Sequence, residues 1–537
     1  MRRLTTFAAG VLLLAAARLP LAAQTFPTND PVLQRIWDIG MNNSQTERLA
    51  QALFDSIGPR LTGSPGQKAG NDWLVKMYDS WGIDAKNEKY GTWRGWRRGM
   101  SHIDLMTPRV RSLEGMMLAY SPGTGGKPVT GGVVMLPLFK DSAEFVKWLP
   151  EAKGKYVLLD GGALPSCRPA LDWTTFGTPS SKARQDTLEG KVYMDRVARI
   201  AGTQYSFGLS GGALSKRLGA AGVAGVLTSR MSDQSNPTAQ RPIGAAGIGM
   251  AGTWPIFETY LESGVGVALS CEDYGLVARL TANNQHPTLR VTADAELLGE
   301  VPVYNTIATV KGGEKADEVV MFSAHFDSWD AGSGATDNGT GTLVMLEAMR
   351  ILKQAYPNPK RTLMAGHWSS EEQGLNGSTA WSEDHPEVVT KLQALFNQDN
   401  GTGRVRSVGG SGLPAMLPAL EGWKAKLPTE WTDTAAVRFN FNPGIPRPGG
   451  TDGTVFGCRG APHFGLGALG WNYGSETWHT NRDTYDKVVF DDLKFNATLT
   501  AMLAYLASED PTFIDRAKVT GEWPASCGNP PRSTRAR

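Results

Sequence analysis

The chain has 537 residues, which is too long for a single compact core, so we expect at least two domains. Hydrophobic residues make up 41% of the sequence and charged residues 20%, as is ordinary for globular proteins. The formal net charge of +2 provides neither a basic nucleic-acid surface nor an acidic tail, which argues against a nucleic-acid-binding function.

The first 23 residues have the pattern of a secretory signal. Arg2 and Arg3 form a basic start, residues 7–17 are apolar, and small residues at 21–23 favour cleavage before Gln24. The apolar stretch is shorter than the roughly 20 residues that a membrane span needs. We therefore expect an exported protein, periplasmic or extracellular, with no membrane span in its mature form.

Helical periodicity marks residues 30–57 and 66–81, on either side of a turn at residues 58–64 that contains Gly and Pro. Two extended segments follow, around residues 85–96 and 101–118. In residues 120–288 short β runs alternate with Gly-rich turns, which predicts an inserted β-rich domain.

Strand and helix patterns alternate again from residue 289 onward and end in a helical region at residues 487–507. This alternation predicts a sheet covered by helices. The predicted division is a discontinuous α/β domain of residues 24–119 and 289–515, an insertion of residues 120–288, and a loosely ordered tail of residues 516–537.

Four cysteines, Cys167, Cys271, Cys458 and Cys527, occur without any CxxC pair, so they do not indicate a zinc knuckle. An oxidising compartment allows up to two disulfides. Pairing Cys167 with Cys271 and Cys458 with Cys527 keeps each bond within one predicted domain, although four cysteines allow three connectivities.

The stretch of residues 319–352 carries the strongest local signal. An apolar run at 319–322 predicts a buried strand, His325 and Asp327 follow it, and a loop rich in Gly and Ser leads to Asp337 and a helical pattern. In open α/β sheets, ligands bind beyond the carboxyl ends of the strands. The stretch therefore places one His and two Asp residues where a binding site is expected.

Five candidate metal ligands lie on separate segments, each at a predicted strand end or in a loop. Imidazole and carboxylate groups suit zinc. Two metals ~3.5–4 Å apart, sharing one carboxylate, could hold a hydroxide as nucleophile and polarise a carbonyl. The candidates are His325, Asp337, Glu372, Asp399 and His479.

Two further carboxylates have predicted catalytic roles. Glu371 adjoins Glu372, so we predict Glu372 as the ligand and Glu371 as the general base that passes a proton to the leaving amine. Asp327 is predicted to accept the other N–H of the His325 imidazole and to fix its tautomer. Each residue alone is more often a surface group or a turn, and it is their joint order that favours a metal site.

This set of residues resembles the M28 family of zinc peptidases, and His325-Phe326-Asp327-Ser328-Trp329-Asp330 resembles its plasma glutamate carboxypeptidase branch. The turn at residues 58–64 is similar to that family's early turn. The resemblance implies a three-layer α/β/α domain with a mixed, largely parallel sheet. It also implies that residues 120–288 form a protease-associated domain, and it allows a homodimer.

The resemblance further implies a two-zinc exopeptidase of the carboxypeptidase or dipeptidase type, acting on dipeptides or short peptides. Asp337 would bridge the two metals, His325 and Asp399 would complete one shell, and Glu372 and His479 the other. An aminopeptidase of the same family, a one-zinc acyl-transfer cyclase and a non-catalytic binding protein on this fold are the alternatives.

The sequence does not identify the residues of the substrate pocket. Residues 450–454 lie where aminopeptidase relatives have a Ser-Asp-His type motif, and the His is absent here. His463 is a nearby candidate for substrate contact. A free substrate carboxylate would need a cation, and the candidates are Arg404, Arg406, Arg447, Arg459 and Arg482.

Overall fold

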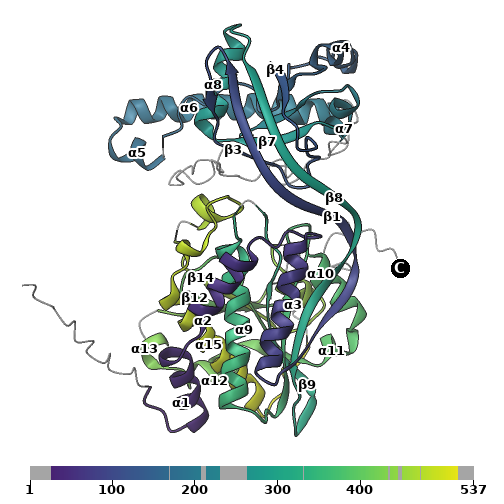
Figure 1. The fold of residues 1–537 in the computed structure, drawn as a ribbon. Helices are drawn as coiled ribbons and strands as arrows, with labels where there is room; N and C mark the ends of the chain where they lie inside the picture. The colour runs from purple at the N-terminus through teal and green to yellow at the C-terminus, as the bar shows by residue number, and fades with distance from the viewer. Residues whose placement is uncertain are drawn as a thin grey trace, which may run out of the picture.

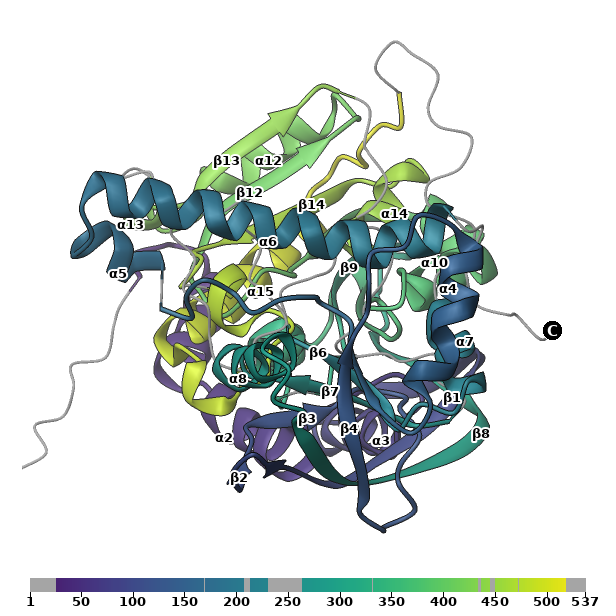
Figure 2. The ribbon, with the colours of Figure 1, turned by 90° about the horizontal axis from the view of Figure 1, so that it is seen from above.

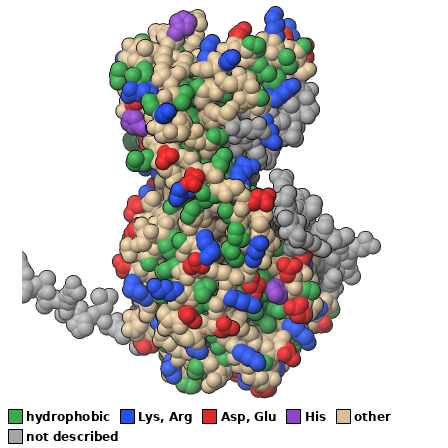
Figure 3. Space-filling model, turned by 45° about the vertical axis from the view of Figure 1, so that its right-hand side comes forward, with side chains coloured by type: hydrophobic (Ala, Val, Ile, Leu, Met, Phe, Trp, Pro, Cys, Tyr) green, Lys and Arg blue, Asp and Glu red, His purple; other side chains and the backbone are tan. Residues whose placement is uncertain are grey.

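The computed structural model describes residues 26–168, 170–206, 213–229, 263–330, 332–432, 436–444, 450–471 and 473–517. The predicted signal at residues 1–23 lies outside these ranges, as do Cys527 and all but the first two residues of the predicted tail. The described chain forms two lobes joined by the long strands β1 and β8, and the molecule narrows between them (Figures 1 and 3). Within these ranges, no helix is both long and apolar enough to cross a bilayer.

The larger lobe is built on the strand order β13-β12-β14-β11-β9-β10-β8. Strands β10, β9, β11 and β14 run parallel to one another, whereas β8 pairs antiparallel with β10 and β12 antiparallel with β14. The predicted mixed, largely parallel sheet is therefore confirmed. Its strands are β9 (Lys315–His325), β10 (Arg361–Trp368), β11 (Leu392–Asn397), β12 (Val405–Ser411), β13 (Arg438–Asn442) and β14 (His463–Ala468).

Helices cover both faces of this sheet, because alternate strand residues point to opposite sides. Along β9, Val320 and Phe322 join the core with α1, α2, α3, α9, α12 and α15, whereas Val319 and Met321 join the core with α10, α11 and α14. These helices are α1 (Pro31–Trp37), α2 (Thr46–Gln51), α3 (Pro65–Ser80), α9 (Thr340–Ala355), α10 (Asn376–Asp384), α11 (Pro386–Thr390), α12 (Met416–Lys424), α14 (Asp452–Cys458) and α15 (Phe490–Glu509); the short α13 (Thr429–Thr432) also contributes Trp431 to the first core.

The two lobes are connected by an antiparallel ribbon of β1 (Asp84–Thr107) and β8 (Thr288–Val310). The sequence predicted two separate extended segments in place of β1, with a second segment reaching residue 118. The register of the ribbon shifts between Lys89 and Gly91, Gly95 and Trp96, and Arg98 and Ser101. Such irregularities break the two-residue alternation on which the prediction rests, although the strand itself continues.

The smaller lobe contains the parallel strands β4 (Val129–Met135), β5 (Tyr156–Leu158), β6 (Gly225–Thr228) and β7 (Val265–Leu269), with β3 (Gly115–Met117) antiparallel to β7. The short β2 (Arg111–Ser112) pairs with β1. The lobe holds more helix than the β-rich prediction allowed. Its helices are α4 (Ser142–Trp148), α5 (Ala170–Thr175), α6 (Pro179–Ser206), α7 (Ala213–Ala220) and α8 (Cys271–Ala282).

Helix α6 extends across the smaller lobe and is the main element that the sequence reading missed (Figure 2). It is rich in polar and charged residues, which weakens its hydrophobic signal in the sequence. A disulfide between Cys167 and Cys271 lies in this lobe, which confirms one of the two predicted pairs. The pairing of Cys458 with Cys527 stays a prediction, because Cys527 lies outside the described residues.

Candidate active site

The predicted ligands lie at one edge of the larger sheet. His325 is the last residue of β9, Glu372 follows β10, and Asp399 follows β11. Because these strands are parallel, their carboxyl ends meet at the same edge. Asp337 lies in the short turn of helix η4 (Ala335–Gly339) that precedes α9, and His479 lies in the loop after η5 (Tyr473–Thr477).

The five side chains form two pairs around Asp337. His325 Nε2 lies 3.2 Å from Asp399 Oδ1 and 3.3 Å from Asp337 Oδ1. His479 Nε2 lies 2.9 Å from Glu372 Oε2 and 3.2 Å from Asp337 Oδ2. Each histidine therefore has its own carboxylate partner, and the two oxygens of Asp337 face one histidine each.

Burial and mutual charge dominate the electrostatics of the two pairs. Burial raises the pKa of Glu372 to about 7, although His479 opposes the shift. Burial lowers the pKa of His479, but Glu372 and Asp337 outweigh it and hold that pKa at about 9. The same balance holds the pKa of His325 well above its ordinary value, with Asp399 as the largest opposing charge. The cluster thus carries negative charge that draws protons onto its imidazoles.

The donor set fits metal ions. One ligand atom from each of His325, Asp337 and Glu372 can be chosen so that all lie within 4.8 Å of one another, and all three side chains are buried. Glu372 Oε1 is buried and has no hydrogen-bond partner among the described residues. Imidazole and carboxylate ligands are those that zinc prefers, and buried acidic groups that lack partners are stabilised by a cation.

Glu371, the predicted base, adjoins this cluster at the end of β10. Burial raises its pKa well above the ordinary value, and Asp399 and Glu372 add to the shift while His325 opposes it. Its backbone N–H donates to Asp327 Oδ1 at 3.1 Å. A carboxylate with a raised pKa beside a metal-ligand cluster has the affinity for protons that a general base needs.

Asp327 lies at the centre of the site but differs in detail from the prediction. The ring atom His325 Nδ1 is 3.0 Å from the backbone carbonyl of Asp327 and 3.7 Å from its carboxylate. The carboxylate instead accepts the backbone N–H groups of Glu371 and Glu372, at 3.1 and 3.3 Å. Asp327 thus orients His325 through its main chain and the Glu371–Glu372 segment through its side chain.

Two buried residues that support the site were not identified from the sequence. Asp483 accepts the backbone N–H groups of Thr336 and Asp337, at 2.6 and 2.9 Å, and burial raises its pKa to about 7. Asp452, the first residue of α14, is fully buried, and burial raises its pKa to about 8. Their sequence signal is weak, since each is a single Asp in a polar loop or at a helix start.

Arg60, within the turn of residues 58–64, holds the loop that follows β9. Its guanidinium donates to the carbonyl oxygens of Phe326, Gly58, Ser333 and Gly334, at 2.7 to 3.0 Å. Burial lowers its pKa to about 10, although nearby carboxylates oppose the shift. The turn was singled out in the sequence, but this role of Arg60 was not.

The predicted carboxylate-binding arginines lie in different surroundings. Arg404 pairs with Asp492, Arg459 contacts Glu383, and Arg406 is exposed on β12. Arg447 lies outside the described residues. Arg482 lies in the His479 loop next to Asp483, and its Nε is buried without a hydrogen-bond partner in the described part of the chain.

Gly453 and His463 explain the missing histidine of residues 450–454. A Cβ placed on Gly453 would lie 2.2 Å from His463 Nε2 and 2.9 Å from Asn397 Cβ. The ring of His463 therefore occupies the space that a side chain at position 453 would need. His463 packs against α14, and burial lowers its pKa to about 4.

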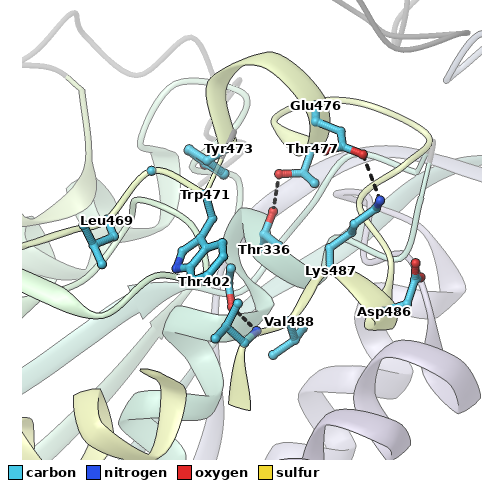
Figure 4. Close-up of a pocket in the computed structure, with 12 residues that line it drawn as sticks. Thr336, Thr402, Leu469, Trp471, Tyr473, Glu476, Thr477, Asp486, Lys487 and Val488 are labelled. Carbon is cyan, nitrogen blue, oxygen red and sulfur yellow. Dashed lines mark hydrogen bonds and ion pairs between the residues drawn. The ribbon is translucent and has the colours of Figure 1, made fainter. Parts of the chain in front are cut away.

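Figure 4 shows a cavity of about 550 Å³ that is lined by residues close in sequence to two predicted ligands, Asp337 and His479. Thr336, next to Asp337, lines it together with Trp471 and Tyr473, and an ion pair joins Lys487 to Glu476 at its edge. Burial and the charges of the metal-ligand carboxylates raise the pKa of Tyr473 well above its ordinary value. Tyr473 thus lines the cavity and is near enough to the predicted ligand carboxylates to feel their charge.

The fold and site define a class of protein, a metallopeptidase. Residues 305–504 match the model of Peptidase family M28. The particular proteins that it resembles include carboxypeptidase Q of Bos taurus, with 23% identity over 475 residues, 88% of this chain and 87% of the relative. Carboxypeptidase Q of Xenopus laevis is 26% identical over 362 residues, 67% of this chain and 66% of that protein.

Solved structures share the fold. A peptidase M28 precursor from Shewanella amazonensis SB2B superimposes with a TM-score of 0.62 at 21% identity, covering 90% of this chain and 97% of that structure. BSAP, a zinc aminopeptidase from Bacillus subtilis, gives a TM-score of 0.51 at 17% identity and covers 88% of this chain and 97% of that structure. These similarities confirm the α/β architecture.

Proposed function

We propose that this chain is an exported two-zinc exopeptidase of the carboxypeptidase or dipeptidase type. The observation that carries the proposal is the arrangement of two histidines, each with its own carboxylate, around Asp337. One zinc would be held by His325 and Asp399, the other by His479 and Glu372, with Asp337 shared. The similarity to carboxypeptidase Q supports the choice of reaction.

The protein's own groups would divide the reaction between them. The metals, when bound, would supply an activated water and polarise the scissile carbonyl. Glu371 would accept a proton from the attacking water and return it to the leaving amine. Its neighbour Asp327 would keep Glu371 in position through the backbone hydrogen bond at 3.1 Å.

Arg482 is the candidate that would bind a free substrate carboxylate. Arg404 and Arg459 already contact acidic side chains, whereas Arg482 lies in the loop of His479 with a buried Nε that has no hydrogen-bond partner among the described residues. A guanidinium matches the two oxygens of a carboxylate. This choice favours a carboxypeptidase or dipeptidase over the aminopeptidase alternative.

Hydrolysis of one dipeptide in three forms tests the proposal: with both ends free, with the amine acetylated, and with the carboxylate amidated. We expect amidation to abolish cleavage, because it removes the charge that Arg482 would bind. Loss on amidation alone would indicate a carboxypeptidase, and loss on either change a dipeptidase. Loss on acetylation alone would indicate an aminopeptidase and would contradict the assignment of Arg482.

A matched pair of variants sharpens the same test. Arg482→Gln should raise KM for the free dipeptide, and the amidated form should stay uncleaved. Arg406→Gln makes the same change at an exposed position of β12. It should alter the cleavage of neither the free nor the amidated dipeptide. A wild-type KM in Arg482→Gln would show that Arg482 does not bind the substrate carboxylate.

A further inference from the structure

Trp329 belongs to the smaller lobe's core although it lies in the catalytic sequence segment. It follows His325 and Asp327 in the loop after β9, and its side chain is 4% exposed. Trp329 belongs to the same core cluster as Trp96 of β1 and Val267 of β7. The loop that follows His325 therefore places one side chain, that of Trp329, in the core of the smaller lobe.

The same indole contacts both members of one predicted metal pair. Trp329 Nε1 donates a hydrogen bond of 2.8 Å to Glu372 Oε2. Its ring meets the imidazole of His479 edge-on, with 5.9 Å between centroids and an angle of 67° between planes. The other pair is oriented differently, because His325 is held by the carbonyl of Asp327.

The residue after Trp329 fixes this loop to the connecting ribbon. Asp330 accepts two hydrogen bonds from Arg98 of β1, at 2.6 and 3.1 Å. The Arg98 guanidinium also lies over the ring of Trp96, 5.0 Å from its centroid. Bidentate pairs of this kind have a defined geometry, so the ribbon sets the position of the Trp329 backbone.

We propose that Trp329 is a positioning residue that holds Glu372 and His479 and couples the smaller lobe to that half of the metal centre. This inference rests on the proposed two-zinc function. A hydrogen bond to the ligand carboxylate and a ring contact to the ligand imidazole limit the orientations of both side chains before metal binds. Partners of this kind typically contribute about 10–100-fold to metal affinity.

The test is a zinc titration of the metal-free chain and of its Trp329→Phe variant. Calorimetry measures the binding steps of each. Phenylalanine retains an aromatic ring but removes the N–H donor. We expect two binding steps in the wild type, with only one of them weakened about 10–100-fold in the variant. A general structural defect would weaken both steps. Cobalt(II) in place of zinc gives a second readout, because one of two visible absorption signatures should be lost.

Trp381→Phe is the matched control. Trp381 is 3% exposed, and its Nε1 has no hydrogen-bond partner among the described residues. Its substitution removes an equally buried indole that packs in a different core cluster, against Trp368 and Phe456, and both zinc steps should stay unchanged. If both zinc-binding steps of Trp329→Phe match those of the wild type, the role of Trp329 is overturned, but the proposed two-zinc function is not. A wild-type chain without any zinc step would overturn the proposed function as well.

A second variant keeps the inference testable if Trp329→Phe does not fold. Arg98→Gln removes the tether at a partly exposed position and should weaken the same zinc step, by less than Trp329→Phe does. Arg97→Gln is its control, because the neighbouring Arg97 pairs with Glu296 at the exposed surface of the ribbon. Identical zinc binding by the two variants would contradict the coupling between the ribbon and the metal centre.

Discussion

At the scale of single residues, the adjacent carboxylates Glu371 and Glu372 have separate roles. Glu372 Oε2 lies 2.9 Å from His479 Nε2, whereas Glu371 adjoins the two pairs and belongs to neither. The two substitutions to glutamine should therefore give different defects.

We expect Glu371→Gln to lower kcat by about 10²–10⁴-fold while zinc stays bound, because the amide cannot accept the proton. Glu372→Gln should instead weaken the binding of one zinc. Steady-state kinetics and elemental analysis on both variants distinguish the two effects. A fully active Glu371→Gln enzyme would exclude Glu371 as the base.

Zinc binding should release protons at neutral pH. In the metal-free chain His479 has a pKa of about 9, above its ordinary value, so its imidazole is protonated at pH 7. Zinc binds the neutral imidazole, and the proton must leave. The affinity should therefore rise as pH increases towards about 9 and level off above it.

Calorimetry at pH 7 in buffers of different ionisation enthalpy measures this release. We expect roughly one proton for each histidine ligand, since the pKa of His325 is raised as well. A zinc affinity that is the same at pH 6 and pH 9 would contradict the charge balance described for the site.

The sequence predicted which residues meet at the sheet edge, because each candidate follows a strand or lies in a polar loop. The residue pattern alone could not predict their pairing, because it depends on the three-dimensional positions of Asp399 and Glu372; the family resemblance implied the pairs that the structure shows. The roles of Trp329 and Arg60 could not be predicted from the sequence for a similar reason. Trp329 acts on a side chain 43 residues away, and Arg60 on carbonyls more than 260 residues away.

At the scale of elements, the turn of residues 58–64 supports the loop between β9 and α9. Arg60 holds that loop through four backbone carbonyls, and it is fully buried. A lysine would keep the charge but has a single nitrogen, so it cannot reach all four oxygens. The loop carries Asp327 and Trp329 and leads to Asp337.

Arg60→Lys should lower the free energy of unfolding by roughly 3 kcal/mol, because buried carbonyls lose charged donors. Arg35→Lys is the control, since Arg35 makes one exposed hydrogen bond to the Gln354 carbonyl. Thermal unfolding of both variants provides the comparison. Equal midpoints would show that the Arg60 contacts do not stabilise the loop.

Long apolar elements were predictable, and polar or irregular ones were not. The predicted closing region at residues 487–507 corresponds to α15 at Phe490–Glu509, because its apolar positions have helical spacing. Helix α6 was missed because its surface is polar, and β1 was divided because bulges interrupt its alternation.

At the scale of the whole molecule, two lobes contribute to one site. The larger lobe supplies the five predicted ligands and Glu371, and the ribbon of β1 and β8 joins it to the smaller lobe (Figure 1). The core of the smaller lobe includes Trp329, which contacts Glu372 and His479. The sequence indicated an insertion in this place, but it gave no sign that Trp329 of the catalytic segment packs in the core of the smaller lobe.

Reconstitution of the metal-free protein tests the central claim most directly. The full chain is treated with a chelator and dialysed, and hydrolysis of an unmodified dipeptide is measured as zinc is added in steps. We predict no hydrolysis without metal and a return of activity that is complete at two zinc ions per chain. Undiminished hydrolysis by the metal-free protein, or a failure to bind zinc, would contradict the account.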